Sequence, residues 1–332
     1  TDHPLLERIG LLHLAGGDWL MQQGEEGDAL YFLVRGRLQA WAAGAGGKRR
    51  GTFLNEIVPG DSIGELSLLT GAPRAVGIQA IRDSLLVSID RSTFEEISRQ
   101  YPVLALKLAT NVALLMQNAN DRARPSTRNL KTICILQMDE NGGTSELVHR
   151  LTDAIGEQGE TLVLQPEGLK ELGAPPGMTA ELAHWIHERE NDHRFLVFHC
   201  RPENGEWMQF ALRQSDIVLQ LAHAAGSPAL RSWESLLEEG AGAAIARRLL
   251  VLHQPSDKAI RGTAEWLEPR RVDYHVHVRR DNDSDIGRVA RIVAGNATGV
   301  VLAGGAARGF AHLGVFRAMR ELGIPVDWIG GT

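Results

Sequence analysis

The sequence predicts a multidomain α+β protein, and three observations point to this class. Short strands separated by glycines fill the first third, apolar strands alternate with amphipathic helices in the middle, and a strand, glycine turn, helix and strand close the chain. A length of 332 residues is enough for two or three domains that each bury a core. We expect a first domain over 1–122, a linker over 123–130, a second domain over 131–296 and the start of a third over 297–332.

Composition limits the classes of function. The 43% hydrophobic and 23% charged fractions are those of a soluble globular protein, and a formal net charge of −6 argues against a nucleic-acid surface. The two cysteines, Cys134 and Cys200, lie in apolar runs and predict buried free thiols. No apolar run has the length of a membrane span and no signal peptide opens the chain, which does not begin with Met, so we expect a fragment or a trimmed chain.

The first third, from Leu14 to Asp90, predicts a small jelly roll or β-barrel. Leu30, Phe32 and Val34 alternate with their neighbours, as in a half-buried strand, and we expect turns at the glycines of this stretch. The predicted turn glycines are Gly24, Gly27 and Gly36. Residues 92–102 and 103–120 then have helical periodicity, with Ser92 or Thr93 as the N-cap of the first helix.

The stretch "IGELSLLTGAPRAVGIQA", from Ile63 to Ala80, predicts a loop that folds around a compact anion. Arg74 can offer a bidentate fork to phosphate oxygens, backbone N–H groups of a short helix add donors, and Glu65 can accept from a sugar hydroxyl. The sequence therefore predicts a site for a phosphorylated sugar here.

This stretch resembles the phosphate-binding cassette of cyclic nucleotide-binding domains, and the flanking "QGEEGDALYFLVRG" and "PGDSIGE" match the same family. The resemblance implies that Gly64 and Glu65 hold the ribose 2′-hydroxyl and that Arg74 holds the cyclic phosphate. Because Ala75 lacks the hydroxyl that cyclic GMP readers place after the arginine, cyclic AMP is favoured over cyclic GMP. The implied binding set is Gly64, Glu65, Leu66, Arg74 and Ala75, with a lid from Val112 or Leu115. The alternative is a cassette that keeps the fold and binds nothing.

The middle third predicts a doubly wound α/β domain with a parallel sheet. Strands are expected over 132–137, 161–164, 195–200, 216–222, 247–254 and 272–280, and helices over 144–158 and 179–190. The loop "MDENGGTSE" lacks the lysine of a phosphate-binding loop, so Thr144 or Ser145 is expected to serve only as an N-cap. His184 with His187, and His275 with His277, lack a third ligand, so no metal site is expected. We interpret this domain as a connector.

The last residues predict a strand over 299–305, a helix over 306–323 and a second strand over 326–329. The glycine-rich turn between the first strand and the helix places backbone N–H groups at a helix N-terminus. Such groups stabilise developing negative charge. An oxyanion-binding turn is therefore expected after the first strand.

This pattern resembles the start of a patatin-like lipid hydrolase. "GGAARG", from Gly304 to Gly309, resembles the oxyanion loop of that family, and Gly331-Thr332 resembles the first two residues of its nucleophile elbow G-x-S-x-G. The order of modules resembles the neuropathy target esterase family. The resemblance implies a serine esterase for phospholipids or lysophospholipids with a Ser-Asp dyad, no cofactor and no metal, in which Gly304, Gly305, Ala306 and Arg308 belong to the site. The serine is expected after Thr332, so this chain is expected to be inactive alone.

Three hypotheses remain at this point. The first is a lipid hydrolase regulated by a cyclic nucleotide, and the second is a nucleotide-dependent transcription factor, which the absence of a basic recognition helix disfavours. The third is a non-catalytic regulatory or scaffold protein. The expected partners are a phospholipid or lysophospholipid, a cyclic nucleotide and the membrane surface, without nucleic acid. The expected location is the cytoplasm, with peripheral contact at the inner face of the membrane.

Overall fold

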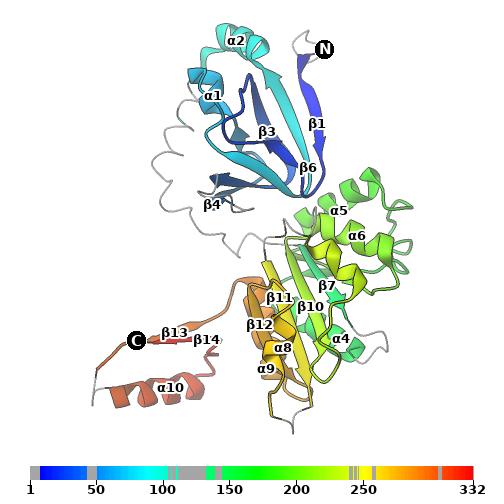
Figure 1. The fold of residues 1–332 in the computed structure, drawn as a ribbon, viewed down its shortest axis with the longest axis vertical. Helices are drawn as coiled ribbons and strands as arrows, with labels where there is room; N and C mark the ends of the chain where they lie inside the picture. Colours follow the sequence, from blue (N-terminus) through cyan, green and yellow to red (C-terminus); the bar gives the residue numbers. More distant parts are fainter. Residues whose placement is uncertain are drawn as a thin grey trace.

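The structure is a computed structural model that describes residues 8–42, 51–103, 106, 110, 132–138, 144–238, 242, 245, 247–255, 259–305 and 309–331. Within these residues the strands form an antiparallel sheet, a parallel sheet and a pair of parallel strands near the C-terminal end. Figure 1 shows the antiparallel sheet and its helices at one end of the molecule and the parallel sheet below them. The predicted mixed α+β class is therefore confirmed. The linker expected over 123–130 lies outside the described residues.

The first sheet has the antiparallel pairing of a jelly roll. Its strand order is β1-β6-β3-β4, with β2 paired to β6 and β5 paired to β3. Leu33, Leu38 and Leu86 point into a core that is almost fully closed to solvent. The elements are β1 (Gly10–Leu14), β2 (Trp19–Met21), β3 (Ala29–Ala42), β4 (Thr52–Ile57), β5 (Ser62–Ile63), α1 (Glu65–Thr70), β6 (Gly77–Asp90) and α2 (Arg91–Gln100).

The interior of β3 departs from the predicted alternation. The pairing of β3 with β6 shifts register between Leu33 and Leu38, so Leu33 is buried whereas Val34 is 47% exposed. Gly36 lies within this strand and not in a turn, with a φ of +102°, and a Cβ there would lie 2.2 Å from the Ser84 hydroxyl oxygen. The glycine is needed because the bulged strand passes close to β6 in a conformation that side chains disfavour. The prediction of a turn at Gly36 is wrong.

Helix α2 begins earlier than the sequence indicated. Its N-cap is Asp90, whose Oδ1 accepts a 2.8 Å hydrogen bond from the Thr93 backbone N–H, so neither Ser92 nor Thr93 is the cap. Asp90 satisfies an N–H group that the first helical turn leaves unpaired. The second helix expected after the barrel, over 103–120, lies almost entirely outside the described residues, as do Val112 and Leu115.

The second sheet is parallel, in the order β12-β11-β10-β7-β9-β8. Every strand predicted for this domain is present, because short runs rich in Val, Ile and Leu are typical of strands buried on both faces. The strands are β7 (Thr132–Gln137), β8 (Thr161–Leu164), β9 (Phe195–Cys200), β10 (Ile217–His223), β11 (Arg247–Gln254) and β12 (Tyr274–Arg279). The helices are α4 (Ser145–Gly156), α5 (Ala180–Asp192), α6 (Gly205–Gln214), the 3-10 helix η3 (Ser232–Leu237), α8 (Thr263–Leu267) and α9 (Asp283–Ala294).

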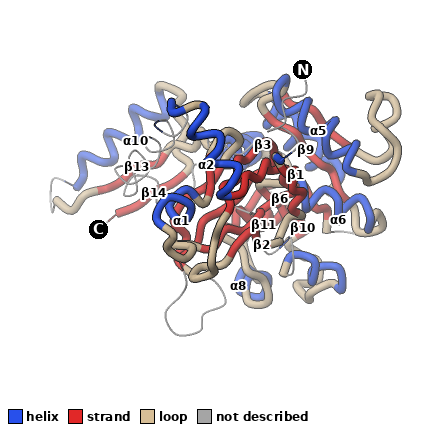
Figure 2. The backbone as a smooth tube through the Cα atoms, turned by 90° about the horizontal axis from the view of Figure 1, so that it is seen from above, coloured by secondary structure: helices blue, strands red, loops and turns tan. Residues whose placement is uncertain are grey.

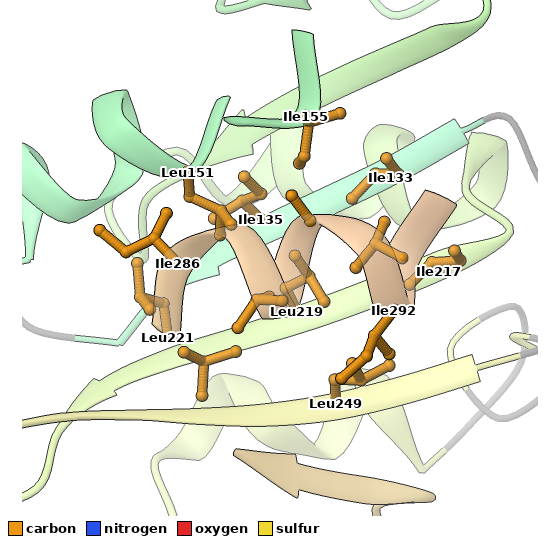
Figure 3. Close-up of a cluster of buried hydrophobic side chains, with 14 of the residues drawn as sticks. Ile133, Ile135, Leu151, Ile155, Ile217, Leu219, Leu221, Leu249, Ile286 and Ile292 are labelled. Carbon is orange, nitrogen blue, oxygen red and sulfur yellow. The ribbon is translucent and has the colours of Figure 1, made fainter. Parts of the chain in front are cut away.

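Helices cover both faces of the parallel sheet. The apolar sides of α4 and α9 pack on one face, whereas α5, α6 and α8 pack on the other. Cys134 and Cys200 are fully buried among the latter group, as predicted, with their sulfur atoms 3.6 Å apart. Figure 3 shows the first face, where helix and strand side chains meet: Ile133, Ile135, Leu151, Ile155, Ile217, Leu219, Leu221, Leu249, Ile286 and Ile292.

The barrel contacts the edge of the parallel sheet at which the strands begin. Arg82 of β6 donates from Nη1 and Nη2 to the carboxylate oxygens of Glu190, near the end of α5, over 2.8 and 3.0 Å. Arg37 of β3 places Nε 2.9 Å from Oδ1 of Asp216, the residue before β10. The side chains of Arg82, Arg37 and Asp216 are no more than 6% exposed. A desolvated cluster of opposite charges therefore joins the two units.

The chain continues as a β-α-β unit: β13 (Gly299–Leu302), α10 (Ala311–Glu321) and β14 (Trp328–Gly331). Figures 1 and 2 both show this unit on the opposite side of the molecule from α5 and α6. Within the described ranges, no helix has the length and apolar character needed to cross a membrane.

Candidate functional site

The cassette predicted over residues 63–80 surrounds the side chain of Arg74. This side chain is 5% exposed although it is an arginine. Its Nη1 donates to the carbonyl oxygen of Gly64 over 3.3 Å and its Nη2 to that of Ala29 over 2.9 Å. The guanidinium carbon lies 5.9 Å from the centre of the Tyr31 ring. Arg74 and Gly64, ten residues apart in sequence, are thus brought together.

Two glycines leave the space that this guanidinium fills. A Cβ on Gly27 would lie 2.1 Å from Arg74 Nε, and a Cβ on Gly64 would lie 2.3 Å from Arg74 Nη1. Gly64 also has a φ of +90°, a backbone conformation that glycine adopts without strain. Gly27 is expected from the sequence only as a turn residue, because no local pattern signals its contact with Arg74.

Backbone hydrogen bonds fix the segment that carries Arg74. The Arg74 N–H donates to the Glu25 carbonyl oxygen, and the Gly24 N–H donates to the Arg74 carbonyl oxygen, each over 2.8 Å. Residues 24–25 therefore form the opposite wall of the cassette. This paired backbone holds Arg74 in place independently of its side chain.

Helix α1 carries the other predicted residues. Gly64 is its N-cap, and Glu65, 7% exposed, accepts a hydrogen bond from the Ser62 hydroxyl. Leu66 is 36% exposed, and Ala75 lies at the surface. Arg91, which no sequence motif singles out, donates to the Leu68 carbonyl oxygen over 2.7 Å and so anchors the C-terminal half of α1. The polar anchors Glu65 and Arg74 are both buried and each already has a partner within the protein.

The predicted oxyanion turn follows β13. Gly304 and Gly305 are exposed, whereas Ala306 and Arg308 lie outside the described residues. His312, in the first turn of α10, places Nε2 3.0 Å from the Ala303 carbonyl oxygen, which ties the helix to the end of β13. The two strands pair in parallel with Leu302 opposite Gly331. The turn after β13 and the end of β14 therefore meet at the same edge of this sheet.

A buried carboxylate joins this unit to the preceding helix. Asp327, 8% exposed, accepts from Arg291 Nη2 over 2.7 Å and from the Thr298 N–H over 2.9 Å. Burial would raise the pKa of Asp327, but the hydrogen bonds from Arg291 and Thr298 and the Arg291 charge outweigh it and lower that pKa. Asp327 therefore fixes the start of β14 next to α9.

The histidine pairs singled out in the middle third have other partners. His184 Nδ1 lies 2.8 Å from Arg35 Nη1, and His187 Nδ1 lies 3.6 Å from Glu190 Oε2. His275 and His277 share one face of β12, with ring centres 5.8 Å apart. Across the described ranges, no group of three or more His, Cys, Asp or Glu side chains is arranged to hold a metal ion.

Comparisons with curated proteins find relatives that match most of this chain. Patatin-like phospholipase domain-containing protein 6 of Homo sapiens is 29% identical over 95% of this chain and 26% of its own length. Patatin-like phospholipase domain-containing protein 7 of Rattus norvegicus is 28% identical over 97% of this chain and 27% of its own length. Lysophospholipase NTE1 of Coccidioides immitis (strain RS) is 29% identical over 95% of this chain and 25% of its own length. The chain spans about a quarter of the length of these relatives.

Solved structures with similarity to parts of the chain include nucleotide-binding domains. The PKAR CBD2 structure with bound Sp-2Cl-cAMPS is 24% identical, with a TM-score of 0.28, over 34% of this chain and 74% of that one. The N-terminal domain of a transcriptional regulator from Streptomyces coelicolor A3(2) is 26% identical, with a TM-score of 0.30, over 36% of this chain and 85% of that one.

Two family descriptions match the chain in succession. Residues 11–101 match the cyclic nucleotide-binding domain, in agreement with the prediction from the cassette. Residues 129–297, more than half of the chain, match the P-loop-like domain of the neuropathy target esterase family. The parallel-sheet domain, for which the sequence alone suggested only a connector, corresponds to this P-loop-like domain. The chain therefore belongs to the neuropathy target esterase family.

Proposed function

We propose that this chain is the nucleotide-sensing and connecting part of a patatin-like serine esterase that acts on phospholipids or lysophospholipids, with cyclic AMP as its regulatory ligand. The observation that carries the proposal is the buried Arg74 guanidinium in a cassette kept open by Gly27 and Gly64. A guanidinium in a desolvated setting is suited to a cyclic phosphate, because its planar fork can donate to two phosphate oxygens.

Nucleotide binding requires a change at Arg74. Its Nη1 and Nη2 donate to the carbonyl oxygens of Gly64 and Ala29, so a phosphate must compete with these bonds or share the guanidinium. A charged acceptor forms stronger hydrogen bonds than a neutral carbonyl, which favours the phosphate. Since Ala29 begins β3 and Gly64 caps α1, this exchange of hydrogen bonds would change the contacts of both elements.

The proposed hydrolytic half uses the turn after β13. In this mechanism a serine after Thr332 attacks the acyl carbonyl, an aspartate acts as its base, and backbone N–H groups of the loop with Gly304, Gly305, Ala306 and Arg308 stabilise the oxyanion. Support comes from the parallel pairing of Leu302 with Gly331, which puts the turn and the end of β14 at one sheet edge. We also propose that the protein lies in the cytoplasm and contacts a membrane surface peripherally.

A non-catalytic scaffold is the second candidate, and one observation favours it. The Arg74 guanidinium and the Glu65 carboxylate are already bonded inside the protein, so the cassette is stable without a ligand. In that case the barrel would serve to position the parallel-sheet domain.

Calorimetric titration of this chain with cyclic AMP and cyclic GMP separates the two candidates. We expect saturable heat with cyclic AMP that is lost in Arg74→Ala and kept in Arg99→Ala, an arginine on the exposed side of α2. Tighter binding of cyclic GMP would reverse the assigned specificity. The absence of heat with both nucleotides at millimolar concentration would favour the scaffold.

Hydrolysis is tested separately. The gene segment after Thr332 should encode Ser-x-Gly, and a protein that contains it should release fatty acid from a lysophospholipid. Replacement of that serine by alanine should abolish release without changing nucleotide binding by the barrel. A segment without this serine would contradict the proposed esterase.

A further inference from the structure

A cavity of about 310 Å³ lies in the parallel-sheet domain, away from the nucleotide cassette and from the turn after β13. Its wall is formed by the segment that enters η3, by the start of β11 and by the chain that leaves α8. The charged side chains on this wall are Arg231, Arg248, Arg270, Arg271, Glu234 and Glu238. Arginines therefore outnumber carboxylates there by four to two.

One arginine and one carboxylate of this group neutralise each other. Arg270 donates from Nε and Nη2 to the two carboxylate oxygens of Glu234, over 2.8 and 2.9 Å. Its remaining donors bond to the carbonyl oxygens of Pro228, Trp266 and Ala229. Both side chains are at most 4% exposed. Both residues line the cavity, and Arg270 has no donors left for a ligand.

The other three arginines face one remaining carboxylate, that of Glu238, so the excess positive charge lies among them. Arg231 Nη1 is buried without a hydrogen-bond partner in the described part of the protein, and its nearest acid oxygen, Glu234 Oε1, is 3.7 Å away. Arg248, whose side chain is 9% exposed, bonds to Glu238 over 2.8 Å. Arg271 is exposed and forms no hydrogen bond or ion pair with another described residue. Buried donors without a partner are costly, so an acceptor in the cavity would be stabilising.

The cavity has the charge and size for a phosphate group. Its volume exceeds that of one phosphate several times, so a substituent can accompany the group. Several guanidinium groups line the cavity and together offer more donors than the two oxygens of one carboxylate can use, which suits a phosphate. The Ser232 hydroxyl, which also lines the cavity, can donate to the same oxygens, whereas the Ser235 hydroxyl already donates to the Ser232 carbonyl oxygen over 3.0 Å.

We propose that the cavity between η3, β11 and α8 binds a phosphate-bearing ligand through Arg231, Arg248 and Arg271. The phosphate can belong to a soluble molecule or to a lipid headgroup, and the chemistry of recognition is the same for both. This site is independent of the cyclic nucleotide proposed for the barrel, because its residues come from the parallel-sheet domain alone.

The test measures phosphate binding in an Arg74→Ala background, so that the barrel cassette does not contribute. Inorganic phosphate is titrated at constant ionic strength maintained with chloride, and binding is followed by calorimetry and by the shift in melting temperature. We expect saturable binding in the background chain. Arg231→Gln should weaken it about tenfold, because a charge-assisted hydrogen bond is lost.

Two further variants separate binding from folding. Arg231 also lies near Glu234 and Trp266, so its loss can perturb the local fold. Arg271→Gln removes an exposed arginine that bonds to none of the described residues, and it should weaken phosphate binding severalfold with an unchanged melting temperature in chloride. Arg99→Gln makes the same charge change on the barrel and should bind phosphate like the background chain.

Vesicle sedimentation identifies the source of the phosphate. Phosphatidylcholine vesicles with and without phosphatidic acid are mixed with the Arg74→Ala chain and its Arg271→Gln derivative. Sedimentation that depends on phosphatidic acid and on Arg271 assigns the site to a lipid headgroup, whereas binding of inorganic phosphate alone assigns it to a soluble ligand. Binding that does not saturate, or that is equal in the background chain, Arg231→Gln and Arg271→Gln, would overturn the proposal.

Discussion

Arg82 of the barrel and Glu190 of the parallel-sheet domain form a bidentate ion pair, although 108 positions separate them in the chain. Burial by itself would lower the pKa of Arg82, but the charges of Glu190 and Asp216 and the hydrogen bond to Glu190 raise it above its ordinary value. Burial would likewise raise the pKa of Glu190, and the charge of Arg82 overcomes this effect and lowers it. Both groups therefore remain charged within the interface between the two domains.

Removal of Arg82 should destabilise the protein strongly. In Arg82→Met the carboxylate of Glu190 loses its bidentate partner, and we expect the free energy of unfolding to fall by about 3 kcal/mol. Urea unfolding followed by tryptophan fluorescence measures the change. Arg317→Met is the matched control: its pair with Glu321 has side chains 76% and 60% exposed, so a change below about 0.5 kcal/mol is expected. Equal effects of the two substitutions would contradict a structural role for the buried pair.

The stability of the chain should depend on pH through Glu190. Because the pKa of Glu190 is lower in the folded than in the unfolded chain, its contribution is complete above the unfolded value of about 4.3 and is lost as the pH falls through the folded value. Glu190→Gln should therefore be less stable than the parent near neutral pH and should lose less stability on acidification. Unfolding free energies between neutral and acidic pH measure this difference. Parallel curves for the two proteins would refute the assignment, and Glu171→Gln, at an exposed position, serves as the control.

A methyl group at position 27 should impair nucleotide binding. The Cβ of Gly27→Ala would lie 2.1 Å from Arg74 Nε, so the guanidinium must move away from the cassette. We expect affinity for cyclic AMP to fall by about tenfold or more, as for the loss of a charge-assisted hydrogen bond. Calorimetric titration provides the affinity. Gly156→Ala, whose added Cβ would have no neighbour within 4 Å, should bind as the parent does, and parent-like affinity of Gly27→Ala would be evidence against the role of Arg74.

Asp327 should control the attachment of the last unit. Asp327→Asn removes the charge that accepts from Arg291 and weakens the bond from the Thr298 N–H, which should lower the local opening free energy by about 1.5–3 kcal/mol. Hydrogen exchange of the amides of Asp327 and Trp328, which both donate to the Thr298 carbonyl oxygen, measures it. Arg291→Gln should have a similar effect and Asp153→Asn, at an exposed site of α4, should have none. Unchanged exchange in Asp327→Asn would show that strand pairing alone holds β14.

The two thiols should react only when the protein unfolds. Burial raises the pKa of Cys200, so little thiolate forms, and both cysteines are closed to solvent. An aromatic disulfide reagent at neutral pH should modify neither Cys134 nor Cys200 in the folded chain and both of them in denaturant. Rapid modification of the folded chain would contradict the packing of these sulfurs, and the denatured chain provides the control for reagent activity.

The sequence was sufficient for the features that local patterns encode. The strands from Thr132 to Arg279 are runs of β-branched and other apolar residues, so their positions were predicted almost residue by residue. The cassette was also predictable, because Gly64, Glu65 and Arg74 lie within a short stretch. Thr179 was expected at the start of a helix, and its hydroxyl oxygen accepts from the Leu182 N–H.

Contacts between distant segments could not be predicted in this way. The bond from Arg74 to the Ala29 carbonyl oxygen spans 45 positions and involves a backbone atom, which no side-chain pattern reveals. The exposure of Val34 results from a shift in strand register, which the sequence pattern does not indicate. Nothing in the sequence around Arg82 indicates that its side chain is buried. The roles assigned to the cassette residues, to Gly304 and Gly305, and to Ala306 and Arg308 stay predictions.

The ion cluster at the start of the parallel strands has a practical consequence for dissecting this protein. A fragment that begins at β7 would be produced with Asp216 and Glu190 deprived of the guanidinium groups that face them here. Such a fragment would have two unpaired carboxylates at one end, and these would tend to bind cations or basic proteins. Isolation of the parallel-sheet domain should therefore begin with removal of these two charges, for example with Asp216→Asn and Glu190→Gln.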